Sequence, residues 1–119
     1  MIKIQGIPYK IITYKNDKEV TKRMEEINKE FGYKDDGDNT PVDGFVDYNR
    51  KEIHLSLDER FDKRSITHTI RHEIVHAFLY EIGNKNHSEE EFVDKIARWM
   101  PELNRIYNDL LKDIKYDGN

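Results

Sequence analysis

The sequence contains no cysteine, which excludes a disulfide-bonded scaffold and any metal site built on thiolates. It also lacks an uninterrupted apolar run of about 18 residues, so no segment is expected to span a membrane. Its 20 Lys and Arg residues do not exceed its 24 Asp and Glu residues, and the two signs are interspersed. No basic surface for nucleic acid or for a membrane is therefore expected. The first residues lack the apolar region of a signal peptide, so we expect a cytoplasmic protein that binds any metal through histidines and carboxylates.

The length and the apolar pattern indicate one folded domain. A chain of 119 residues is long enough for a hydrophobic core but leaves little for a separate substrate-binding lobe. Hydrophobic residues make up 36% of the chain and charged residues 37%, but the hydrophobic ones recur at the spacings of strands and helices. We expect residues 1–119 to form a single α+β domain with a small, mostly antiparallel sheet.

The periodicity gives the order of the elements. Strands are expected at residues 2–4, 9–14, 42–48 and 51–57, with turns at residues 6–8 and 49–50 and a polar loop at residues 34–41. Helices are expected at residues 17–31, from residue 62 or 65 to residue 82, and after Ser88, where Pro101 is expected to divide two segments. In the last strand, alternation predicts Ile53, Leu55 and Leu57 on one face and Glu52, His54 and Ser56 on the solvent face.

The C-terminal segment has a broad apolar stripe. It consists of Leu103, Ile106, Tyr107, Leu110 and Leu111. Packing of the stripe on its own domain is the simpler interpretation, and a weak dimer through this helix is the alternative. We therefore expect a monomer or a weak dimer.

The clearest chemical motif is His72-Glu73-Ile74-Val75-His76, which reads HExxH within a predicted helix. Histidines four residues apart lie on one helix face, so both imidazoles can reach one metal ion. Glu73 lies at the edge of that face, where it can act on a metal-bound water without being a ligand. His68 extends the row by another turn. The alternative is a set of core histidines hydrogen-bonded to backbone and carboxylates.

A third ligand is available at the start of the next helix. Ser88 and Glu91 have the spacing of a capping box, in which Glu91 bonds back to the helix start and leaves Glu90 free. Asp94 follows Glu90 by four residues, so the two share a face, and Asp94 can accept the other N–H of a liganding histidine. Alternatively, the glutamates only complement the helix dipole.

These residues resemble those of gluzincin-type zinc metallopeptidases, in particular the small ImmA/IrrE-like and phage-encoded HExxH proteins. The likeness covers residues 42–101, including the hairpin with Gly44, the Arg71 that precedes the motif, and Met100-Pro101. It implies a minimal zincin-like domain, in which the sheet packs on a central HExxH helix and a second helix bears a ligand. It also implies one Zn²⁺ per chain held by His72, His76 and Glu90, with Glu73 as general base and Asp94 behind a ligand. The segment after the motif is short, and Asp94 replaces the family's usual Asn. HExxH is shared by many peptidase families, so the substrate does not transfer.

The resemblance implies a zinc endopeptidase that acts on a protein or peptide, such as a regulator from a phage or mobile element. The exposed edge of the hairpin is a candidate for holding an extended substrate. Candidates for the residue that stabilises the transition state are His87, Tyr80 and His68. Two other functions stay open: a non-catalytic interaction module whose metal is structural or absent, and a hydrolase for a non-peptide bond. A nucleic-acid binder is disfavoured by the charge pattern.

Overall fold

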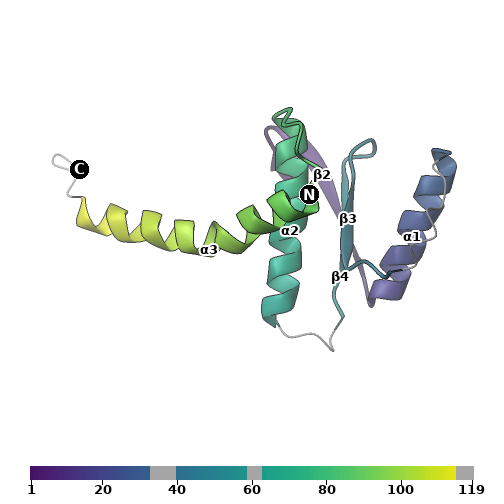
Figure 1. Ribbon diagram of the computed structural model, residues 1–119, viewed down its shortest axis with the longest axis horizontal. Helices are drawn as coiled ribbons and strands as arrows, with labels where there is room; N and C mark the ends of the chain where they lie inside the picture. Colours follow the sequence, from purple (N-terminus) through teal and green to yellow (C-terminus); the bar gives the residue numbers. More distant parts are fainter. Residues whose placement is uncertain (33–39, 59–62, 115–119) are drawn as a thin grey trace.

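The chain forms a small α+β domain, as predicted (Figure 1). The computed structural model describes residues 1–32, 40–58 and 63–114, so most of the predicted loop at residues 34–41 lies outside the described residues. Along the chain the elements are β1 (Ile2–Ile4), β2 (Ile7–Tyr14), α1 (Asp17–Glu30), β3 (Gly44–Asp47), β4 (Glu52–Ser56), α2 (Lys63–Glu81) and α3 (Glu90–Asp113).

The sheet has the strand order β1-β2-β4-β3. Its two outer pairs, β1 with β2 and β4 with β3, are antiparallel hairpins, which confirms the mostly antiparallel prediction. The central pair, β2 with β4, is parallel and runs from Lys10 opposite Glu52 to Tyr14 opposite Ser56. The first turn lies at Gln5 and Gly6, which both have positive φ, rather than at residues 6–8 as predicted. In the strand order given above, β3 is an edge strand of the sheet.

Helices cover both faces of the sheet, α1 on one side and α2 on the other (Figure 1). One core cluster lies between the sheet and α2 and includes Tyr9, Ile53, Leu55 and Ala77. A second lies between α2 and α3 and consists of Val75, Leu79, Val93 and Ala97, with Phe92, Ile96 and Met100 packed against it. Because α2 contributes to both clusters, it is the central helix of the domain.

His54 was expected on a solvent face, and this prediction is wrong. Its side chain is only 1% exposed because α1 covers that face of the sheet. The ring stacks on Phe45 with a centroid distance of 4.2 Å. The Tyr14 hydroxyl lies 2.7 Å from Nδ1 and the Glu52 carboxylate 3.1 Å from Nε2. Burial lowers the pKa of His54, opposed by the neighbouring Glu52 carboxylate, so the neutral ring is favoured in the folded protein.

Pro101 was predicted to divide the last helix, and this prediction is wrong. Helix α3 runs unbroken through Pro101. Proline has no N–H, so the carbonyl of Ala97, four residues earlier, loses its helical partner. The Arg71 side chain of α2 replaces that partner by donating from Nε to the Ala97 oxygen at 3.2 Å. The predicted break therefore fails because of a side chain from another helix.

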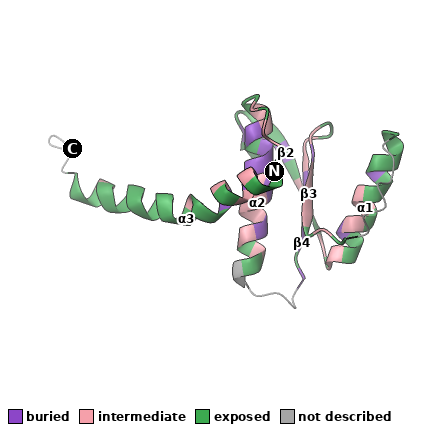
Figure 2. Ribbon diagram, in the orientation of Figure 1, coloured by how far each residue is buried: buried purple, intermediate pink, exposed green. Residues whose placement is uncertain are grey.

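The outer half of α3, residues 101–113, extends away from the domain, so the predicted packing of its apolar stripe is wrong (Figure 2). Leu103 is 63% exposed, Tyr107 59% and Leu110 56%. Trp99 is also 60% exposed, whereas Phe92 and Ile96 pack between α2 and α3. The domain is accordingly elongated, with extents of 58 × 34 × 26 Å.

Candidate metal centre

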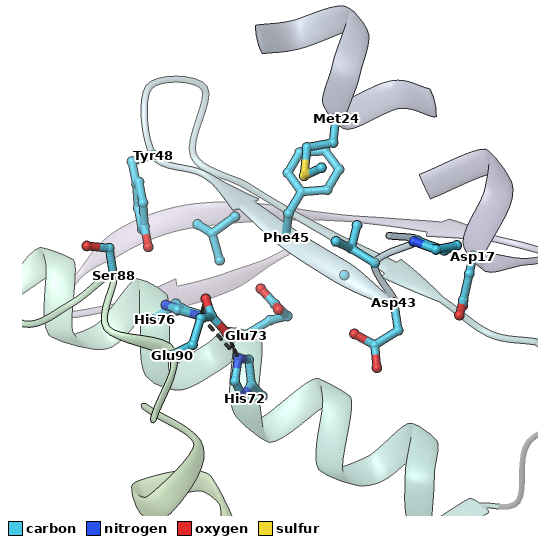
Figure 3. Close-up of a pocket in the computed structure, with 14 residues that line it drawn as sticks. Asp17, Met24, Asp43, Phe45, Tyr48, His72, Glu73, His76, Ser88 and Glu90 are labelled. Atoms are coloured by element: carbon cyan, nitrogen blue, oxygen red, sulfur yellow. Dashed lines mark hydrogen bonds and ion pairs between the residues drawn. The ribbon is translucent and has the colours of Figure 1, made fainter. Parts of the chain in front are cut away.

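Three predicted metal ligands converge where α3 begins beside α2 (Figure 3). His72 and His76 lie one turn apart on α2, with 3.1 Å between their Nε2 atoms. The carboxylate of Glu90 faces both rings: Oε2 lies 2.8 Å from Nε2 of His72, and Oε1 lies 3.0 Å from Nε2 of His76. The two histidines and the carboxylate therefore meet at one point.

The connection between α2 and α3 brings Glu90 into this position. After α2, Gly83 adopts a positive φ, and Gly83 and Asn84 donate backbone hydrogen bonds to Tyr80 and Leu79, which ends the helix as predicted. The next helix begins at Glu90 with Glu89 as N-cap and no side-chain cap bond, so the predicted capping box is wrong. Glu90 is thus in the first turn of α3.

Hydrogen bonds define which nitrogen of His76 faces the centre. Its Nδ1 lies 2.7 Å from the backbone oxygen of His87, and since a carbonyl only accepts, Nδ1 carries the proton. The Nε2 of the neutral ring is then a lone pair directed at the other two groups. Nδ1 of His72 lies 3.4 Å from Asp94 Oδ1, which favours the same tautomer. Two lone pairs and a carboxylate at such short distances fit a divalent cation, and this donor set suits zinc.

A second cluster on the same helices is less suited to a metal. This second cluster consists of His68, His72 and Asp94, whose ligand atoms lie within 4.8 Å of one another. The same distance holds within the motif itself, for His72, Glu73 and His76. However, Asp94 already accepts from His68 at 2.8 Å and from Arg98 at 2.8 Å. The hydrogen bond from His68, with the nearby charges, lowers the pKa of Asp94. The charge of Asp94 is therefore engaged, and its place beside His72 suits an orienting role.

Glu73 is buried beside the ligands, with only 4% of its surface exposed. Its Oε2 has no hydrogen-bond partner among the described residues. Burial, together with the charges of Glu90 and Asp43, raises the pKa of Glu73 to about 8. A methyl group in place of the Gly44 hydrogen would lie 2.9 Å from the His54 carbonyl oxygen and 3.0 Å from Cγ of Glu73. Glycine at position 44 therefore allows Glu73 to pack directly under β3.

A cavity of about 480 Å³ opens in front of these groups, between edge strand β3 and helix α2 (Figure 3). Tyr48 lines it, and in the figure its hydroxyl points to the side where His76 lies. Burial, followed by the charges of Glu73 and Glu90, raises the pKa of Tyr48, so the phenol keeps its proton and can donate. Sequence reasoning missed this residue, although strand alternation puts it on the same side as Val46, which packs toward α2.

None of the three predicted transition-state stabilisers lines this cavity. His68 is bonded to Asp94. The Tyr80 ring stacks on Tyr48 with centroids 4.3 Å apart, and the His87 ring meets both tyrosines edge-on at 5.2 Å. Tyr80 and His87 therefore hold Tyr48 in place, and Tyr48 is the better-placed donor.

Comparison with known proteins assigns no function to the site. No family model, curated protein or solved structure matches the chain. Among the described residues, no helix combines the length and the apolar character needed to cross a membrane. The likeness to gluzincins therefore stays a hypothesis that depends on the motif residues.

Proposed function

We propose that the chain is a zinc-dependent metallopeptidase whose metal is held by His72, His76 and Glu90. The observation that carries the proposal is the convergence of two imidazole nitrogens and a carboxylate within 3.1 Å of one another. Beside them lies the buried Oε2 of Glu73, which has no hydrogen-bond partner among the described residues. A purely structural metal site does not need a buried carboxylate that is not one of its ligands, as Glu73 is here.

Zinc held by His72, His76 and Glu90 would supply a Lewis acid that polarises a carbonyl, and it would lower the pKa of a water molecule to about 7. Glu73 then takes the proton from the attacking water and returns it to the leaving amine nitrogen. Burial and the charges of Glu90 and Asp43 raise the pKa of Glu73 to about 8 when only protein groups surround it. A cation held by the three ligands would lower that pKa and favour the carboxylate form that accepts the proton.

The residues around the cavity account for the other requirements of peptide hydrolysis. Tyr48 donates a hydrogen bond to the carbonyl oxygen as negative charge develops on it. The free edge of β3 runs along the cavity, so an extended peptide can pair with its backbone. Strand pairing requires chain on both sides of the bond that is cut, so we infer an internal bond of a protein target.

The first test is the zinc content of the purified protein by elemental analysis, with Glu90→Gln and Glu91→Gln variants measured beside it. Both glutamates lie exposed in the first turn of α3, so they form a matched pair. We expect about one zinc per chain, lost in Glu90→Gln and kept in Glu91→Gln. Wild-type protein that takes up no zinc at neutral pH would reject the proposal and favour a non-catalytic interaction module.

A further inference from the structure

The exposed stripe on the outer half of α3 continues the stripe by which its inner half packs. Apolar residues follow one another at alternating spacings of three and four, which is the pattern of a helix that packs along its whole length. This apolar seam consists of Val93, Ile96, Met100, Leu103, Tyr107 and Leu110. The first three pack against α2, whereas the last three are more than half exposed.

The charged residues of the outer half lie on the other side of the helix. Arg105 donates to Glu102 at 2.5 Å and to Asp109 at 2.8 Å, and these pairs are exposed. Ile106 and Leu111 flank the seam instead, which widens its apolar face. A helix with one charged and one apolar face buries the apolar face, and an unpacked helix of this length is only marginally stable in water.

The same molecule has a matching apolar trough of about 560 Å³ between β1, α2 and α3. Its apolar lining includes Ile2, Ile74, Phe78, Ile96 and Met100. Ile2 is 37% exposed and Phe78 42% exposed, so part of the apolar lining of the trough is in contact with solvent. Ile96 and Met100 belong to both seam and trough, so the two surfaces adjoin.

The outer half cannot fill the trough of its own chain. The helix continues through Pro101, held by the bond from Arg71 to the Ala97 carbonyl, and it leads away from the domain (Figure 1). The occupant must therefore be another molecule. We propose that it is a second copy of this chain, with two α3 helices antiparallel across a two-fold axis near Pro101, so that each outer half lies along the partner's trough.

Two features of the surface favour a second copy. A two-fold interface must be self-complementary, and this chain carries both an apolar ridge and an apolar groove, with its charges turned away from them. A stable interface buries about 800 Å² per partner. Six large apolar side chains of the seam, its flank and the trough are 37–63% exposed, so a second copy that covers them removes an apolar area of that order from water: Ile2, Phe78, Leu103, Ile106, Tyr107 and Leu110.

Sedimentation velocity on the full chain tests the dimer, over a concentration series. We expect a species of twice 14.3 kDa for the wild type. The seam variant Leu103→Gln/Leu110→Gln and the trough variant Phe78→Gln should each weaken self-association about tenfold or more, because each removes a central apolar contact. The control Arg105→Gln/Lys112→Gln changes the charged face of the same helix and should leave the dimer intact.

Circular dichroism of each variant shows whether the domain still folds. A wild type that stays monomeric at its highest soluble concentration would overturn the proposal. So would a dimer that survives either the seam or the trough substitution in a folded protein. Because the readout is molecular mass, the result does not depend on whether the chain proves to be a peptidase.

Discussion

His54 lies on the α1 side of the sheet and the pair His72 and His76 on the α2 side, and the two regions differ in what surrounds the ring nitrogens. On the α1 side, both ring nitrogens of His54 have a protein partner, and aromatic rings stack against the imidazole. On the α2 side, His72 and His76 each direct one nitrogen at a common point that they share with Glu90. Glu73 lies beside that point with an oxygen that no described residue satisfies.

The difference shows that burial alone does not identify a reactive histidine. His54 is the most buried of the three, yet its hydrogen bonds are complete, so nothing is left for a ligand to satisfy. On the α2 side, two imidazole nitrogens and a carboxylate meet within 3.1 Å, and Oε2 of Glu73 has no hydrogen-bond partner among the described residues. An incomplete set of partners is therefore the better criterion for the functional site.

The largest expected effect comes from the general base. Glu73→Gln should lower peptidase activity about 10²- to 10⁴-fold, because the amide cannot accept the proton of the attacking water. Bound zinc should remain at wild-type level, since Glu73 is not among the proposed ligands. The control is Glu52→Gln, which makes the same change beside His54 and should keep activity. Wild-type turnover in a zinc-loaded Glu73→Gln variant would rule out this role.

Tyr48→Phe should have the next largest effect. Loss of the phenol removes one donor to the developing oxyanion, which we expect to reduce kcat about 10²- to 10³-fold while KM changes little. Steady-state kinetics at saturating zinc measure both constants. The matched control is Tyr14→Phe, which removes the hydroxyl that contacts His54 and should leave kcat unchanged. Equal losses in the two variants would point to a structural cause.

Removing the side chain behind His72 should weaken metal binding. Asp94→Ala deletes the carboxylate 3.4 Å from Nδ1 of His72, and we expect zinc affinity to fall about 10- to 100-fold. Competition with a chromogenic chelator measures the affinity. Asp109→Ala, on the exposed outer half of α3, is the control. An affinity equal to that of the wild type would show that Asp94 does not orient the ligand.

The smallest expected effect is a pH dependence of the stability contributed by His54, whose two ring nitrogens both have protein partners. The pKa of His54 is lowered in the folded protein from the ordinary 6.5, so below about pH 6.5 the unfolded chain binds the proton more readily. The stability that the neutral ring contributes is present above that pH and is lost as the pH falls. In urea unfolding of zinc-free protein, we expect the difference between wild type and His54→Gln to narrow from pH 8 to pH 5. Parallel pH curves would contradict this.

Local patterns were sufficient to predict the part of the site that lies on one helix. Four-residue spacing put His72 and His76 on one face, and the acidic start of the next helix supplied Glu90. Features that depend on distant residues were not predictable. His54 is buried because α1 covers it, and Pro101 is accommodated because Arg71 donates to Ala97. Strand alternation gives the side on which Tyr48 lies but not the cavity in front of it.

The parallel pairing of β2 with β4 constrains when the site can form. Lys10 aligns with Glu52, so the central pair of the sheet joins segments separated by all of α1 and β3. Such long-range pairing is slow relative to helix formation. During synthesis, β2 emerges long before β4, and Glu90 emerges after both. We therefore expect that a metal ion held by Glu90 and the two histidines would bind a domain that has largely folded, in contrast to zinc fingers, where the metal organises the chain.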